Sequence, residues 1–183
     1  MVKRGFVMNT EIKELTSAQA NKLLKKLKDE YAALIEKENS CKTFKASVGE
    51  DIESVRPPYD YAETRAKLDL YSKQIRTIKH AVNVFNCTHK VDGYDMTIDE
   101  MLVYIPQLTN KKSRLAEMRS KTPKERVDDP YSKRSAIIEY VYANYDLNAA
   151  ETDYQEVSDE LTRAQLALDI TNNGEKMKIE LIV

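Results

Sequence analysis

Apolar residues recur at alternating steps of three and four along two long segments, and this spacing restricts the fold more than any other feature. Such steps keep side chains on one face of an α-helix, as in a coiled coil or a tight helical bundle. One stripe is Leu68, Tyr71, Ile75, Ile78, Val82 and Phe85, and the other is Leu147, Ala150, Tyr154, Val157, Leu161, Ala164 and Leu168. We therefore predict two long amphipathic helices, from about Tyr59 to Thr88 and from about Leu147 to Ile170.

A third helix is predicted before the first of these stripes. It begins at about Thr10 or Thr16 and ends near Asn39, followed by a loop over residues 40–58. Its apolar stripe has the same spacing and consists of Leu24, Leu27, Tyr31 and Leu34. Residues 1–9 are predicted to be a disordered or loosely held N-terminus.

The remaining long helix has the clearest start signal in the sequence. Thr97 and Glu100 have the spacing of a capping box, in which each side chain satisfies a backbone N–H at the start of a helix. The helix is expected to continue to about Arg119. Pro106 lies within it and removes a backbone donor, so the helix either ends there or is continuous with a kink.

Two segments favour β-structure instead. Residues 134–145 are dense in β-branched and aromatic side chains, and residues 177–183 alternate apolar and polar side chains. These two segments are expected to pair as a small ribbon. The predicted fold class is therefore mainly α, with four long amphipathic helices in one domain over residues 1–183 and a small β-ribbon.

The composition argues against several classes of protein. The net charge is −1, so no overall field favours nucleic acid or an anionic membrane surface. No apolar run approaches the roughly 20 residues that a membrane span requires. Cys41 and Cys87 follow no metal or redox spacing; one disulfide is conceivable, but free thiols in a reducing compartment are favoured. A cytoplasmic protein without a cofactor or a metal is expected.

Catalytic motifs are scarce. The two histidines, His80 and His89, have no metal-ligand spacing to cysteine or glutamate, and helix-surface roles suit them better than general-base roles. The sequence contains no nucleophile elbow, P-loop or dinucleotide fingerprint. We therefore predict that the protein is not an enzyme.

A polar cluster separates the second and third long helices. Asn83 and Asn86 are three residues apart, so both amides lie on one helical face beside the apolar stripe, with Thr88 shortly after them. Asp92-Gly93 predicts a turn. The amide pair either forms a buried hydrogen-bond network or faces a ligand, and the sequence leaves both interpretations open.

A basic stretch follows at residues 111–126, where seven lysines and arginines face only two glutamates. The segment that follows Asp146 is acidic instead, so one interpretation of the basic stretch is charge complementarity between packed helices or subunits. The alternative is an anion site, since lysine and arginine bind phosphate. The candidate anion-binding residues are Lys112, which interrupts the apolar stripe, Arg119, and Tyr131 and Arg134 of the following loop.

The order of these motifs resembles the septicolysin-like family, whose members are small helical proteins of bacteria and their phages with no defined biochemical role. The resemblance extends over about residues 24–173 and rests on Asn83-x-x-Asn86, Asp92-Gly93, Met96-Thr97 at a helix start, and Asp129-Pro130-Tyr131-Ser132. The sequence departs from the family pattern at Phe85 and Tyr94. The resemblance implies an oligomeric helical bundle, and the family name implies membrane activity.

Three functions are compatible with these observations. The first is a homo-oligomeric binding protein that holds a small anionic, nucleotide-like ligand between helices or subunits. In a phage, such a protein would sequester a host signalling molecule. The second is a coiled-coil adaptor for a protein partner, and the third is a membrane-active protein. The polar cluster, the basic stretch and the lack of catalytic groups favour the first, with no nucleic-acid or membrane partner.

Overall fold

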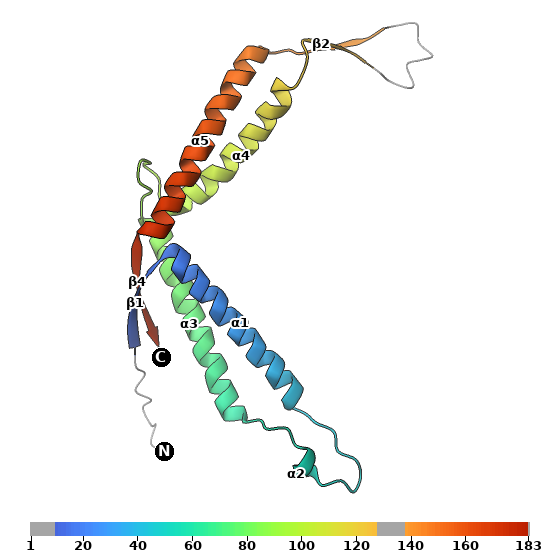
Figure 1. Ribbon diagram of the computed structural model, residues 1–183, viewed down its shortest axis with the longest axis vertical. Coiled ribbons are helices and arrows are strands. Elements are labelled where there is room, and N and C mark those ends of the chain that lie inside the picture. The colour runs from blue at the N-terminus through green and yellow to red at the C-terminus, as the bar shows by residue number, and fades with distance from the viewer. Residues whose placement is uncertain (1–9, 128–137, 183) are drawn as a thin grey trace. The chain divides into compact units, whose positions relative to one another are not determined.

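A computed structural model of the chain describes residues 10–127 and 138–182. Within them, four long helices and two short ribbons confirm the predicted mainly α fold (Figure 1). The helices are α1 (Ser17–Cys41), α2 (Ile52–Val55), α3 (Tyr61–Thr88), α4 (Ile98–Arg119) and α5 (Leu147–Gly174). The strands are β1 (Thr10–Thr16), β2 (Lys124–Arg126), β3 (Tyr140–Tyr142) and β4 (Lys176–Ile182).

The chain divides into two compact units. The first unit comprises residues 1–89 and 170–183, and the second comprises residues 90–169. The division falls within α5, whose last residues belong to the first unit. Each unit contains one pair of long helices and one two-stranded antiparallel sheet.

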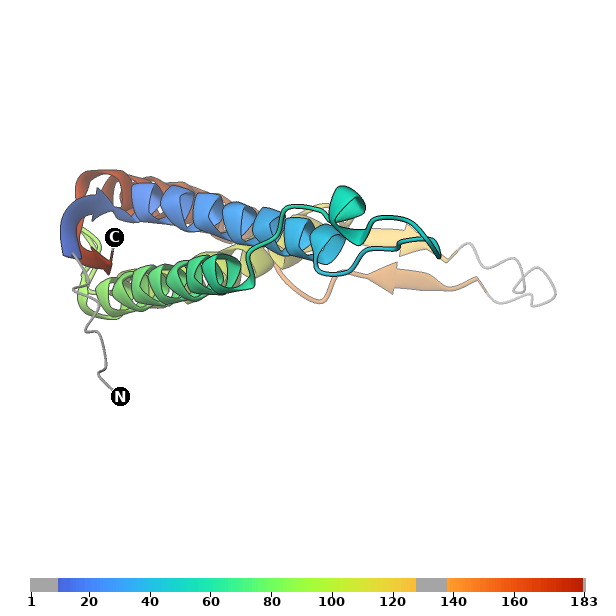
Figure 2. The same ribbon diagram turned by 90° about the horizontal axis from the view of Figure 1, so that it is seen from below.

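In the first unit, α1 and α3 pack side by side, and β4 packs on α3 (Figures 1 and 2). Strand β4 alternates exposed and buried residues, as expected for a strand with one face on a core. Its buried side chains join residues of both helices in one apolar cluster. The cluster contains Ala20, Leu27, Ile78, Val82, Met177, Ile179 and Leu181.

Helix α1 begins at the later of the two predicted start points. The Thr16 hydroxyl accepts a hydrogen bond from the Gln19 backbone N–H at 3.2 Å, and the Gln19 side-chain carbonyl accepts one from the Thr16 N–H at 3.0 Å. This reciprocal capping box fixes the helix start. A start at Thr10 is wrong, because the segment from Thr10 to Thr16 is strand β1.

The predicted pairing of the two β-segments is also wrong. Strand β4 pairs with β1, in the register Thr10 with Ile182 through Thr16 with Lys176. Strand β3 pairs with β2, which follows α4 directly. Both predicted segments do form strands. Their partners, β1 and β2, were not predicted as strands because both are rich in polar residues.

In the second unit, α4 and α5 pack against each other through their apolar stripes. The buried side chains are Ile98, Met101, Leu108 and Leu115 on α4, and Ala150, Val157, Leu161, Ala164 and Leu168 on α5. The turn before α4 is the predicted one, because Gly93 has φ of +80° and the Tyr94 N–H donates to the Val91 carbonyl at 3.0 Å. Asp146 caps α5 by accepting from the Asn148 N–H at 2.8 Å.

Helix α4 confirms the predicted capping box and continues through Pro106. The Thr97 N–H donates to a Glu100 carboxylate oxygen at 2.7 Å, and the Glu100 N–H donates to the Thr97 hydroxyl at 3.3 Å. Pro106 lies on the exposed side of the helix. Proline has no N–H, so the carbonyl of Leu102, four residues earlier, lacks its usual helical donor. Leu102 is also exposed. Water can therefore satisfy that carbonyl.

Candidate functional site

The predicted asparagine cluster lies on the last turns of α3, in the first unit. Asn83 is exposed, and the Thr88 hydroxyl donates to the Val84 carbonyl at 2.8 Å, which is a bond within the helix. The Asn86 side-chain oxygen is buried and has no hydrogen-bond partner among the described residues. Asn86 is therefore the one member of this cluster with an unused buried acceptor, and neither Asn83 nor Thr88 lines either of the two pockets described below.

Lys112 and Arg119 belong to the second unit, where the structure brings them together on one aromatic ring. The Arg119 guanidinium lies 3.8 Å from the Tyr154 ring centroid, and the Lys112 ammonium lies 5.6 Å from it. Arg119 also donates to both carboxylate oxygens of Glu151, at 2.9 and 3.1 Å. The pKa of Glu151 is lowered by its hydrogen bond from Gln155 and by Arg119. These contacts join α4 to α5, as charge complementarity predicted.

Tyr131 and Arg134, the other predicted ligand-binding residues, lie outside the described residues. They fall in the connection between β2 and β3. The predicted site residues therefore do not all belong to one unit: the asparagine cluster lies in the first, and Lys112 and Arg119 lie in the second.

The second unit contains a pocket of about 420 Å³ at the foot of the β2–β3 ribbon, which we call the ribbon-foot pocket. It lies among the end of α4, the segment that leads into β2, and the end of β3. Its lining residues are Arg114, Glu117, Met118, Lys121, Thr122, Glu125, Val141, Tyr142, Ala143 and Tyr145. This volume lies within the range of typical small-molecule sites.

Local hydrogen bonds hold the walls of the ribbon-foot pocket in place. The Tyr145 hydroxyl donates to the Met118 carbonyl at 2.8 Å, near the end of α4. The Ala143 N–H donates to the Pro123 carbonyl at 3.2 Å and joins the end of β3 to the start of β2. The Tyr145 ring is therefore fixed with its polar tip satisfied, and it presents apolar surface to the pocket.

The charges in the ribbon-foot pocket differ from those at Tyr154. Arg114 and Lys121 are exposed, and neither forms an ion pair with any carboxylate in the described parts of the chain. Glu117 and Glu125 also line the pocket but hold no described cation. A pocket lined by cations, tyrosines and apolar side chains suits a ligand that combines a planar ring with a negative charge.

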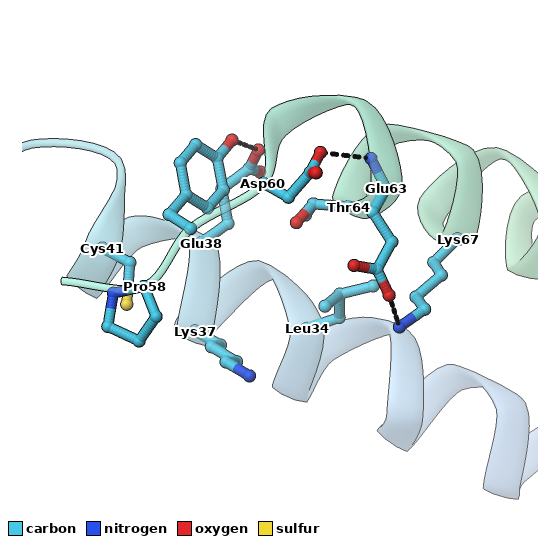
Figure 3. A pocket seen from close by; sticks show the side chains of 10 residues that line it. Leu34, Lys37, Glu38, Cys41, Pro58, Asp60, Glu63, Thr64 and Lys67 are labelled. Carbon is cyan, nitrogen blue, oxygen red and sulfur yellow. Dashed lines mark hydrogen bonds and ion pairs between the residues drawn. The ribbon is translucent and has the colours of Figure 1, made fainter.

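The first unit has a pocket of about 390 Å³ between the end of α1 and the start of α3, which we call the helix-end pocket (Figure 3). Four of its lining residues, Glu38, Tyr59, Glu63 and Lys67, already pair with one another, and a fifth, Asp60, caps a helix. The Tyr59 hydroxyl donates to Glu38 at 2.8 Å, Asp60 caps α3 by accepting from the Glu63 N–H at 2.8 Å, and Glu63 pairs with Lys67. Burial, followed by the bond to Glu38, raises the pKa of Tyr59.

The carboxylates make the helix-end pocket a poor site for an anion. Glu38, Asp60 and Glu63 line it, against the two lysines Lys37 and Lys67. Cys41 lies at its edge as a free thiol, half-buried, and Cys87 is free and exposed on α3. Among the described residues, no cluster of three or more histidine, cysteine, aspartate or glutamate side chains has the geometry of a metal site.

Sequence reasoning overlooked the residues of the ribbon-foot pocket. In the sequence, Lys112 stands out because it interrupts the stripe between Leu108 and Leu115. That same spacing places it on the helix face toward α5, where it contacts Tyr154. Arg114 lies two residues further, about 200° around the helix, and so points elsewhere. The helical period alone predicts that Lys112 and Arg114 point in different directions. It does not predict that the ribbon lies next to Arg114.

Comparisons with known proteins identify the fold and no function. No protein-family model matches the chain, and no curated protein is similar to it. A similar solved structure is the crystal structure of a functionally unknown conserved protein from Corynebacterium diphtheriae. The match has a TM-score of 0.54 at 13% identity and covers 90% of this chain and 99% of the other.

This likeness shows a shared fold and leaves the septicolysin-like resemblance a prediction. No helix in the described residues is long and apolar enough to cross a membrane.

Proposed function

We propose that the chain is a non-enzymatic binding protein that holds a small anionic, nucleotide-like ligand in the ribbon-foot pocket. One observation carries the proposal. A single pocket of about 420 Å³ combines apolar side chains, two tyrosines and two cations without described carboxylate partners. The predicted binding residue Arg119 lies on the same helix, but it is already held by Glu151.

The residues suggest how such a ligand would lie. A planar ring would pack against Tyr142 and the apolar side chains of Met118 and Val141, which line the pocket together. The negative group would meet Arg114, whose guanidinium forms paired hydrogen bonds to phosphate or carboxylate oxygens, and Lys121, which adds a compact charge. Glu117 and Glu125 would disfavour ligands whose negative charge is placed on their side of the pocket.

Self-association is a second part of the proposal. The sequence predicted a homo-oligomer that assembles through the apolar stripes of α3 and α5. Within the single chain, those stripes already pack: Ile78 and Val82 join the core of the first unit, and Val157 and Leu161 are buried in the second. A homo-oligomer would therefore use another surface, and the pocket needs no second copy to form its described walls.

A ligand screen tests the proposal. Thermal shift and calorimetry over mononucleotides, dinucleotides and cyclic nucleotides should find at least one compound that stabilises the protein, because a ligand that binds only the folded state raises its stability. The double variant Arg114→Gln/Lys121→Gln should weaken that binding by about tenfold or more, given roughly 1.5–3 kcal/mol for a hydrogen bond to a charged group.

The matched control is Arg76→Gln/Lys79→Gln, which removes one arginine and one lysine from an exposed part of α3. It should bind the same compound as tightly as the parent protein does. If no compound stabilises the protein, or if the Arg114 and Lys121 variant binds as well as the control, the proposal is wrong. A stoichiometric protein partner, found without any small-molecule effect, would favour an adaptor instead.

A further inference from the structure

The β2–β3 ribbon presents two aromatic and two basic side chains on one face. Its register pairs Lys124 with Tyr142 and Arg126 with Tyr140. Directly opposed residues of an antiparallel pair project to the same face, and alternate residues of one strand share a face. These four residues therefore form one surface, which we call the Tyr–Lys face. Glu125 and Val141, between them, project to the other face; they line the ribbon-foot pocket, and so does Tyr142 of the Tyr–Lys face.

The tyrosines of the Tyr–Lys face are held side by side and remain exposed. The Lys124 ammonium lies 3.9 Å from the Tyr140 ring centroid and 5.4 Å from that of Tyr142. The ring centroids are 6.4 Å apart and tilted by 53°. Tyr140 is 44% exposed and Tyr142 is 60% exposed. Lys124 lies close to both rings, and about half of each tyrosine remains exposed to solvent.

Exposed rings beside cations have a specific chemical use. Proteins that bind single-stranded nucleic acid stack bases on aromatic side chains and neutralise the neighbouring phosphates with lysine and arginine. An acidic peptide would use the cations but gain little from the rings. We propose that the Tyr–Lys face binds single-stranded nucleic acid, with bases on Tyr140 and Tyr142 and phosphates at Lys124 and Arg126.

Local charge supports this proposal, although the net charge of −1 predicted no nucleic-acid partner. That expectation averaged the charge over the whole chain. Residues 111–126, which lead into and include β2, carry seven basic side chains and two acidic ones. Arg119 is paired with Glu151, and the other six basic side chains still outnumber the two acidic ones. Phosphate attraction falls off over about 10 Å at ordinary ionic strength, so the local excess decides it.

Fluorescence anisotropy with labelled oligo-dT and oligo-rU of about 20 nucleotides tests the proposal, starting near 50 mM salt. Binding should weaken as salt rises. Lys124→Gln/Arg126→Gln should reduce the slope of log K against log salt by about 1.4, since each phosphate contact to a single strand contributes about 0.7. Tyr140→Ala/Tyr142→Ala should weaken binding by about tenfold or more, because it removes stacking from two bases.

Each variant has a matched control in the first unit. Tyr61→Ala removes a tyrosine that is 62% exposed and lies beside Arg65. Arg76→Gln/Lys79→Gln removes one arginine and one lysine, as Lys124→Gln/Arg126→Gln does. Both controls should bind like the parent protein. Circular dichroism and thermal midpoints of all four variants establish that they are folded before binding is compared.

Three results would overturn the proposal: no binding at about 100 µM protein in low salt, equal binding by the ribbon variants and their controls, or binding to vesicles containing anionic lipid but to neither oligonucleotide. Tyr142 belongs both to the ribbon-foot pocket and to the Tyr–Lys face, so the cation variants are the ones that separate this test from the mononucleotide screen. Arg114→Gln/Lys121→Gln reports on the ribbon-foot pocket, whereas Lys124→Gln/Arg126→Gln reports on the Tyr–Lys face, so either proposal can fail alone.

Discussion

The two units combine the same parts, one pair of long helices and one two-stranded ribbon, but they use the ribbon differently. In the first unit, every second residue of β4 is buried against the helices, and the ribbon supplies Met177, Ile179 and Leu181 to the core. In the second unit, all six residues of β2 and β3 are exposed. A ribbon that contributes to a core is constrained in sequence by packing, whereas an exposed ribbon can carry residues selected for binding.

Core substitutions should give the largest difference between the two ribbons. Ile179 in β4 is 1% exposed, and Ile179→Ala should lower the free energy of unfolding by about 2–5 kcal/mol, because it leaves a cavity among well-packed side chains. Val141 in β3 is 61% exposed, and Val141→Ala should change the free energy of unfolding by no more than about 0.5 kcal/mol. Urea denaturation of both variants measures the two effects. If both variants lost a similar amount of stability, Val141 would be buried in solution, contrary to its exposure in the structure.

The two capping boxes offer a smaller comparison. Thr16→Ala and Thr97→Ala each remove a hydroxyl that accepts from a backbone N–H, at a cost of about 0.5–2 kcal/mol. Thr16 is 5% exposed, so its loss leaves a donor with poor access to water and should lie at the upper end of that range. Thr97 is less buried and should lie at the lower end.

Thr109→Ala is the control for both cap variants. Its hydroxyl donates to the Ile105 carbonyl at 2.9 Å in the middle of α4, where threonine is a weaker helix former than alanine. That substitution should be neutral or slightly stabilising by thermal denaturation. A Thr97→Ala variant as stable as Thr109→Ala would mean that the second box has no role in defining the start of α4.

The helices were predictable because their signals are local. The stripe that includes Ile78 and Val82, and the Thr97 box, depend on residues within a few turns of one another, so the helix extents follow from the helical period and capping chemistry. Strand β1 was not predictable in the same way. Its inner face carries Glu11 and Lys13, which form an ion pair at 3.3 Å, so it lacks the alternation that identifies a strand.

The candidate site was harder to predict than the helices, for a related reason. The basic excess at residues 111–126 was visible in the sequence, but the partners that neutralise or free each cation lie far along the chain. Arg119 meets Glu151 and Tyr154 across two helices, while Lys124 meets Tyr140 across the ribbon. Which cations stay free for a ligand is therefore a tertiary property. Composition can show only that a surplus exists.

The smallest expected difference between the two units is in how their stability depends on alkaline pH. Burial and the shared Glu160 carboxylate raise the pKa of Tyr94 and of Tyr104, whose hydroxyls donate to it at 3.1 and 3.3 Å. The pKa of Tyr59 in the first unit is raised in the same direction. A tyrosine whose pKa is higher in the folded state contributes fully to stability below the unfolded value of 10.0. That contribution is lost as the pH rises through the folded pKa.

Denaturation between about pH 9 and pH 11 measures this loss. Tyr94→Phe/Tyr104→Phe should make stability less dependent on pH over that range, because it removes two hydroxyls that must stay protonated in the folded protein. Tyr59→Phe, which removes one, should have the weaker effect. The effects are small since all three side chains are only half-buried, and water stabilises part of the charge on each phenolate. If Tyr59→Phe reduced the pH dependence more than the double variant, the shared contact at Glu160 would not hold α4 against α5, and the alkaline weak point would lie in the first unit.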